Sequence, residues 1–219
     1  MTSAPAEKIG SERLPLTQER ILQAAVDLVD EHGIDALSMR RLGSVLGVEA
    51  MSIYNHIPNK ATLLRQLVNK IIALIEIPPQ EDDWEERLKK MSRNYRALAQ
   101  AHPHFVELIA TTPYGASLPA LRQVEAIFEI LKAGGFHQSQ WMDIVRTFST
   151  FAIGFTMSEV SGFLGESDES SQEDIDYGAV MHEFPLMVEM LPHMGELDHN
   201  AQFEFGLEVF ISGLKAKLG

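Results

Sequence analysis

The stretch Ser38–Lys60 constrains the fold of this chain most strongly, because it has the pattern of two short helices joined by a tight turn. Leu42, Val45 and Leu46 fall at i, i+3 and i+4, which predicts one apolar face of a first short helix. Gly47 follows at the position where a left-handed C-terminal cap favours glycine. Two helices about such a turn form a helix-turn-helix, whose second helix is free to enter the major groove of DNA.

The second short helix has a narrow apolar stripe and a mostly polar remainder. Ile53 and Ile57 predict the stripe that faces the small core. The side chains that point elsewhere are Met51, Ser52, Asn55 and His56. This division predicts a helix with one face available to a partner.

The whole pattern resembles the DNA-binding domain of the tetracycline-repressor (TetR) family of transcriptional regulators. The segments that carry the resemblance are Met39–Leu42, Leu46–Val48, Ser52–Ile57 and Asn59–Leu64, and it extends over about Thr17–Ile77. A long, ordered motif of this kind is more specific than a short pattern. The alternative is a pair of helices that packs without binding DNA.

The resemblance implies two sets of DNA contacts. Phosphate contacts fall on Ser38, Ser52, Tyr54, His56 and Lys60, and base reading falls on Arg40, Ala50 and Met51. The guanidinium fork of arginine suits O6 and N7 of guanine, whereas alanine and methionine offer only apolar contact, for example to a thymine methyl group. A lysine at the start of a helix opposes the helix dipole, but a bound phosphate reverses that penalty. Each residue taken singly also fits a solvated surface.

Charge separates the two parts of the chain. Residues 1–77 hold 8 Lys and Arg against 9 Asp and Glu, and residues 78–219 hold 10 against 22, which gives the net charge of −13. A broad basic surface for nonspecific nucleic-acid binding is therefore excluded, but a local DNA reader is not. Repulsion between the duplex and the acidic remainder favours docking through the first part alone.

Composition favours a soluble protein of the cytoplasm. The 219 residues include no cysteine, which excludes disulfides and fits a reducing compartment. No apolar run approaches the roughly 18 residues of a membrane-spanning helix, and the polar start lacks a signal-peptide pattern. We expect a disordered arm over residues 1–15 and no membrane contact.

The sequence predicts an all-α fold of two domains. A first helix runs from its N-cap Thr17 to Gly33, and a fourth begins near Asn59 and stops at Pro78-Pro79, because proline cannot continue the hydrogen-bond ladder. This places a three-helix DNA-binding domain over residues 16–77, with the fourth helix at its C-terminal end. A larger helical domain for ligand binding and dimerisation follows over residues 78–219.

The larger domain has only helical patterns. Apolar spacing predicts helices over about 82–101, 103–110, 117–133, 139–162, 176–191 with an interruption at Pro185, and 200–218. In the third of these, the predicted inward residues are Leu121, Val124, Phe128 and Leu131. The helix that starts at Ser139 has too many apolar residues for one face, so we expect burial on more than one side. The Ser-rich acidic run 165–176 reads as an exposed loop.

Glycines within two helices indicate close approach of another backbone. They are Gly154 and Gly162 in the long helix and Gly206 and Gly213 in the last one. Each costs roughly 1 kcal/mol relative to alanine in a helix interior. Periodicity alone leaves intrachain packing and dimerisation equally open, and the resemblance favours dimerisation, because family members pair through a four-helix bundle of C-terminal helices. A two-fold dimer spaces its reading helices by about 34 Å of DNA or a multiple, which calls for a near-palindromic operator.

Aromatic residues of the larger domain are candidates for lining an apolar effector cavity. Two histidines that flank Pro103 are candidates for orienting a polar group of the effector. The full candidate set for ligand contact is His102, His104, Phe105, Tyr114, Phe128, Trp141, Phe148, Phe151, Phe155 and Met157. Most aromatic residues at helical spacing belong to the core, which is the alternative for each.

Two other functions remain open. A helical metal enzyme would use His182, His193 and His199, but these lack metal-ligand spacing, and no nucleophile elbow or phosphate-binding glycine motif occurs. A dimeric ligand-binding or protein-interaction module with weak or lost DNA binding would fit the net negative first domain and Ala50. We expect instead a non-enzymatic homodimeric repressor without cofactor or metal, released from its operator by a small, largely apolar effector. By the resemblance, the effector would move the fourth helix and change the separation of the reading helices.

Overall fold

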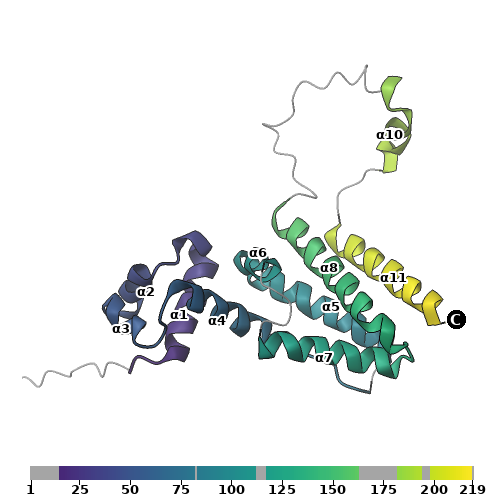
Figure 1. The fold of residues 1–219 in the computed structure, drawn as a ribbon. Coiled ribbons are helices and arrows are strands. Elements are labelled where there is room, and N and C mark those ends of the chain that lie inside the picture. The colour runs from purple at the N-terminus through teal and green to yellow at the C-terminus, as the bar shows by residue number, and fades with distance from the viewer. Residues whose placement is uncertain (1–14, 82, 112–116, 163–181, 194–197, 219) are drawn as a thin grey trace, which may run out of the picture. The chain divides into compact units, whose positions relative to one another are not determined.

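The computed structural model describes residues 15–81, 83–111, 117–162, 182–193 and 198–218. The elements of these ranges are helices, which confirms the all-α prediction (Figure 1). Internal contacts divide the chain into two compact units, residues 1–67 and 68–219. The predicted arm over residues 1–15, the predicted loop over 165–176 and the candidate Tyr114 lie outside the described residues, apart from residue 15.

Three helices build the smaller unit, and their ends follow local capping signals. They are α1 (Gln18–His32), α2 (Met39–Leu46) and α3 (Ala50–Tyr54), with a short 3-10 turn η1 (Ile34–Ala36) between the first two. The Thr17 hydroxyl accepts a hydrogen bond from the Arg20 N–H at 3.2 Å, so Thr17 caps α1 as predicted. Gly47 ends α2 in the left-handed conformation with φ 69°, also as predicted.

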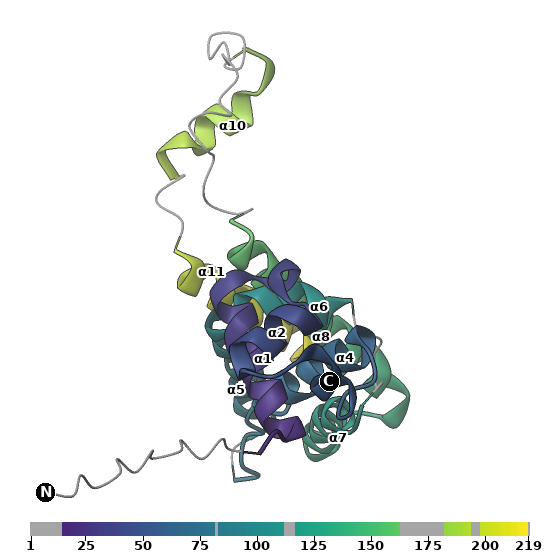
Figure 2. The same cartoon turned by 90° about the vertical axis from the view of Figure 1, so that its left-hand side faces the viewer.

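The core of the smaller unit lies where α1 packs on α2, which lie side by side in Figure 2, and where α2 packs on α3 (Figure 1). Ile53 and Ile57 are fully buried, in agreement with the predicted stripe. The prediction for α2 is wrong at Val45, which is exposed. The buried face of α2 runs instead through Met39, Leu42 and Gly43, because α3 begins against Gly43. A Cβ at that glycine would lie 2.8 Å from the Val48 carbonyl oxygen, so only glycine permits this approach.

The fourth helix, α4 (Lys60–Ile72), ends earlier than predicted. The Asn59 side chain accepts from the Thr62 N–H at 2.8 Å and caps its start, as expected. Between the end of α4 and the prolines, side chains of the larger unit bind two backbone carbonyls. Asn94 donates to the Glu76 carbonyl at 2.9 Å, and Gln123 donates to the Ile75 carbonyl at 3.0 Å. These two hydrogen bonds hold the segment after α4 on the larger unit.

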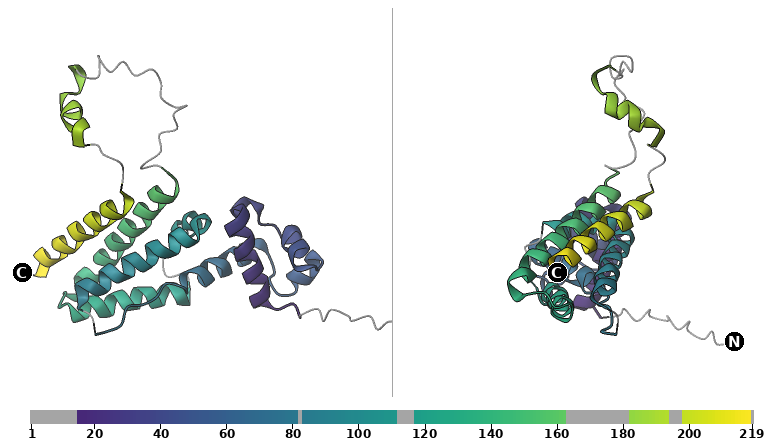
Figure 3. Two further views of the ribbon diagram at one scale, coloured as in Figure 1. Left: turned by 180° about the vertical axis from the view of Figure 1, so that it is seen from behind. Right: turned by 90° about the vertical axis from the view of Figure 1, so that its right-hand side faces the viewer.

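The larger unit is a helical bundle. Its long helices are α5 (Trp84–Ala101), α7 (Leu118–Ala133), α8 (Trp141–Val160) and α11 (His199–Leu218), and its short elements are η2 (Pro103–Phe105), α6 (Val106–Ala110), η3 (Gln138–Gln140), α10 (Pro185–Met190) and η5 (Leu191–His193). Helix α5 contacts α7, α8 and α11, and α8 lies beside α11 (Figure 3). Helix α10 begins at Pro185, a position at which proline is tolerated. None of the helices described here is long and apolar enough to cross a membrane.

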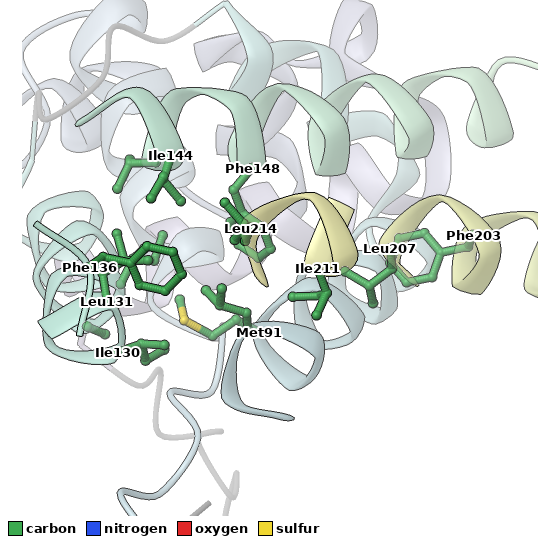
Figure 4. Close-up of a cluster of buried hydrophobic side chains, with 14 residues drawn as sticks. Met91, Ile130, Leu131, Phe136, Ile144, Phe148, Phe203, Leu207, Ile211 and Leu214 are labelled. Carbon is green, nitrogen blue, oxygen red and sulfur yellow. The ribbon is translucent and has the colours of Figure 1, made fainter. Parts of the chain in front are cut away.

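A single apolar cluster fills the bundle (Figure 4). Its buried members come from all four long helices and the α7–α8 turn; among them are Leu88, Met91, Ile130, Leu131, Phe136, Ile144, Phe148, Phe203, Leu207, Ile211 and Leu214. The prediction that Leu121 points inward is wrong, because α7 buries Ala126, Ile127, Ile130 and Leu131 and leaves Leu121 exposed. Similarly, α8 buries one stripe within the chain, whereas Met157 on another face is exposed.

Candidate DNA interface and effector domain

The exposed face of α3 carries the proposed reading residues. Met51 is 67% exposed, and Tyr54 and His56 are also exposed. Ala50 and Ser52 are half-buried beside the fully buried Ile53. The small core therefore holds α3 by one residue per turn and leaves its other faces accessible, which is the geometry that groove binding requires.

The remaining DNA candidates surround that face on neighbouring elements. Ser38 caps α2, and its hydroxyl accepts from the Arg41 N–H at 3.2 Å, so its structural role is established alongside any phosphate contact. Arg40 and Lys60 are exposed, at the starts of α2 and α4. In the part of the chain that the structure describes, neither cation forms a salt bridge, so both are available to an anionic partner.

The aromatic ligand candidates fall into three separate groups in the larger unit. Phe148, Phe151 and Phe155 of α8 pack with Phe203 and Phe210 of α11, with ring centroids 5.1–6.5 Å apart. The seven-residue spacing of Phe203 and Phe210 places both on one face of a helix, but spacing cannot show that they join this cluster. A Cβ at Gly206 would lie 2.7 Å from the Phe151 ring, so a side chain of the same chain, and not the expected backbone, approaches this glycine.

The second group joins α7 to the start of α8, and the third lies in η2 and the residue before it. Phe128 packs on Trp141 at 5.5 Å, and the Trp141 indole N–H donates to the Phe136 carbonyl at 3.0 Å. Phe105 is fully buried and meets the half-buried His102 edge to face at 6.1 Å. The candidates His104 and Met157 are exposed. The structure thus brings some of the ligand candidates together and leaves their role in binding a prediction.

A buried ionic network lies beside the aromatic cluster, and the sequence did not predict it. Arg96 binds Glu159 through two hydrogen bonds of 2.9 and 2.6 Å and donates to the Asn200 side chain at 2.9 Å. Its guanidinium carbon also lies 4.8 Å from the centre of the Phe203 ring. The hydrogen bonds from Arg96 hold the pKa of Glu159 below its usual range, against the opposing effect of burial. The only sequence signal was a charged residue on an otherwise buried helix face.

The histidines considered for a metal site are not gathered into one. His182 and His193 are exposed and His199 is half-buried. Within the described ranges, no group of three or more His, Asp or Glu side chains is arranged to hold a metal ion.

Comparisons with known proteins agree with the two-part architecture. Residues 21–67 match the family described as bacterial regulatory proteins, tetR family, and residues 77–218 match the tetracyclin repressor-like C-terminal domain. The tetracycline repressor protein class A from transposon 1721 of Escherichia coli is 29% identical over 202 residues, which cover 91% of this chain and 90% of that protein. The HTH-type transcriptional repressor DrrR1 of Streptomyces coeruleorubidus is 25% identical over 215 residues, covering 91% of this chain and 77% of that protein.

A solved structure extends the similarity to the fold. The TetR family protein ActR of Streptomyces coelicolor, in complex with actinorhodin, matches with a TM-score of 0.80 at 29% identity and covers 94% of this chain and 100% of its own. Regulators of this family are not enzymes. From the helix-turn-helix, the helical bundle and these matches together, the chain belongs to the tetR family and is a DNA-binding transcriptional regulator.

Proposed function

We propose that the chain is a homodimeric repressor that binds a near-palindromic operator and is released by a small-molecule effector. The observation that carries the proposal is the exposed face of α3, flanked by Arg40 and Lys60 without carboxylate partners among the described residues. Residues 16–77 would form the DNA-binding part and residues 78–219 the part that binds effector and partner subunit. The repressors of Escherichia coli and Streptomyces coeruleorubidus described above support the negative sense of regulation.

The outward faces of α8 and α11 support dimerisation. Phe205 and Val209 of α11 are exposed large apolar residues, and Gly213 lies one turn further along the same stripe. On α8, Met157 is exposed and Gly154 lies on the same side. A Cβ built at Gly154 or Gly213 meets no atom within 4 Å among the described residues, so packing there does not require glycine at either position. A second copy that approaches both helices would explain the small residues and the exposed apolar ones together.

The larger domain supports control by a ligand. Its aromatic groups supply apolar surface, and ActR binds actinorhodin in a fold that matches 94% of this chain. An effector releases DNA only to the extent that it binds the non-DNA conformation more tightly. The hydrogen bonds from Asn94 and Gln123 to the segment after α4 would carry such a change to the DNA-binding part.

Selection from a random duplex pool tests the proposal directly. We expect the full chain to enrich a near-palindrome, with binding that weakens steeply as salt rises because Lys and Arg displace counterions from phosphate. Arg40→Ala should cost about 1–3 kcal/mol and relax base preference at one position of each half-site. Tyr54→Phe and Lys60→Ala should weaken binding alike on all sequences, with the lysine change lowering the salt slope by about 1.

The control is Lys132→Ala, which removes an exposed lysine from α7 and should leave both affinity and slope unchanged. Equal loss on every duplex for all three DNA-site variants would refute the base-reading role of Arg40. A pool without any enriched sequence at low salt would instead favour a ligand-binding module that has lost DNA binding.

A further inference from the structure

Arg87 is a buried cation whose Nε has no hydrogen-bond partner among the described residues. It lies on α5, is only 3% exposed, and its Nε is buried without a hydrogen-bond acceptor. Among the residues that the structure describes, no carboxylate forms a salt bridge with it, although residues 78–219 contain 22 Asp and Glu. The guanidinium is a cation, so this site holds a buried positive charge.

The other two arginines of α5, Arg93 and Arg96, have side-chain hydrogen-bond acceptors. Arg93 binds Glu204 through hydrogen bonds of 2.8 and 2.7 Å, and Arg96 binds both Glu159 and Asn200. These two guanidinium groups are thus paired with carboxylates. Among the three arginines of α5, Arg87 alone has a buried Nε without an acceptor in the described residues, which leaves this N–H available to a bound molecule.

The surroundings of Arg87 indicate what kind of molecule would supply the acceptor. Met91, one turn further along α5, belongs to the buried apolar cluster. Asn94, two turns further along and on the same face, donates to the carbonyl of Glu76 in the segment after α4. Arg87 thus shares one face of α5 with a residue of the apolar core and, two turns away, with a residue that binds the segment after α4.

We propose that the guanidinium of Arg87 binds the carboxylate, or another planar anionic group, of the effector. The inference rests on the proposed control by a ligand, and it adds that the ligand is an organic anion with an apolar body. A guanidinium presents two parallel N–H donors to a carboxylate, and charge-assisted bonds of this kind are stronger than neutral ones. The net charge of −12 on residues 78–219, from the 10 basic and 22 acidic residues, opposes entry of small free anions. An apolar body offsets that repulsion by its own burial.

The test observes Arg87 itself and uses no DNA. In full-length protein labelled with ¹⁵N, the Nε–H signal of Arg87 is identified by its loss in Arg87→Lys. The protein is then titrated with sodium formate, 2-naphthoate and the neutral isostere 2-naphthamide, each against matched sodium chloride. We expect saturable shifts of this signal with formate and naphthoate, and binding of naphthoate about tenfold or more tighter than naphthamide, as a charge-assisted bond requires.

Two variants separate the guanidinium from net charge. Arg87→Met should abolish the preference for naphthoate and should unfold at an equal or higher temperature without anion, because a buried unpaired charge is removed. Arg146→Met removes an exposed arginine of α8 and should keep the preference. If Arg87→Met does not fold, Arg87→Lys replaces it, and loss of the planar fork should weaken naphthoate binding.

Three results would overturn the proposal. They are an Arg87 signal that follows only the sodium chloride control, a preference for naphthoate that survives in Arg87→Met, and an Nε–H that exchanges too fast to be seen. A fast-exchanging Nε–H would show that water accepts the hydrogen bond of the guanidinium. Failure of operator binding would leave all three readouts intact, so this inference and the proposed function fail separately.

Discussion

Removing the carboxylate of Glu159 should destabilise the larger domain strongly. Glu159→Met leaves the Arg96 guanidinium buried without the two hydrogen bonds of 2.9 and 2.6 Å that the carboxylate accepts. An uncompensated buried charge of this kind costs about 3–5 kcal/mol. The bond to Asn200 at 2.9 Å and the Phe203 ring at 4.8 Å remain, so we expect the lower end of this range.

The matched variant replaces both partners. Arg96→Met combined with Glu159→Met removes both charges, and replacing a buried ion pair by apolar residues is often neutral. The double variant should therefore recover most of the loss, which shows that the penalty comes from the orphaned charge rather than from the lost contact itself.

Urea unfolding at neutral pH, followed by circular dichroism at one fixed protein concentration, measures the free energy of unfolding of the three proteins. The reasoning is refuted if Glu159→Met costs less than about 1 kcal/mol, since that is the range of an exposed pair. It is also refuted if the double variant is as unstable as the single one, because the cost would then arise from packing.

Three further predictions concern pH, the helix-turn-helix and the dimer. Arg96 lowers the pKa of Glu159 in the folded state, so the stabilisation of the fold by this pair is complete above the ordinary glutamate pKa of about 4.3 and is lost as pH falls through the pKa of the folded state. Urea midpoints measured at stepped acidic pH should therefore fall further in wild type than in the Arg96→Met, Glu159→Met double variant. Gly43→Ala should lower the free energy of unfolding by about 1–3 kcal/mol and weaken DNA binding, because its Cβ would lie 2.8 Å from the Val48 carbonyl oxygen. Ser44→Ala at the next, exposed position should do neither; urea unfolding and operator titration compare the two variants. Val209→Asp should shift the sedimentation coefficient from that of a dimer to that of a monomer, because it places a charge in the proposed interface at a residue 57% exposed in the protomer. Leu121→Asp on α7, at a residue 49% exposed, should leave the dimer intact. Equal behaviour of the two variants would argue against an interface through α8 and α11.

Local signals determined much of the smaller unit. The caps at Thr17 and Gly47 appear where the sequence predicted them, because a cap depends only on residues within one turn. The stripe of Ile53 and Ile57 is equally local, since two residues one turn apart share a face in any helix. The resemblance to the family rests on the same short-range pattern, and the matches over residues 21–67 and 77–218 agree with it.

Which face of a helix is buried was not determined locally. Val45 and Leu121 have the spacing of core residues and are exposed, because the neighbouring helices pack on adjacent stripes of α2 and α7. Helix α4 also ends before the prolines, and the segment that follows it is held by Asn94 and Gln123, which lie far along the chain. A helix offers several faces, and the choice among them is made by partners elsewhere in the chain.

The sequence by itself thus determined that the chain is helical, where α1 begins and α2 ends, and that Ile53 and Ile57 are buried beside the exposed Met51. Tertiary structure alone paired Arg96 with Glu159, which lies 63 residues away, and left Arg87 on the same helix without a carboxylate in the described chain. Both arginines look alike in the sequence. They differ because a buried charge depends on what the folded chain brings within hydrogen-bond distance, and no pattern along one helix records that.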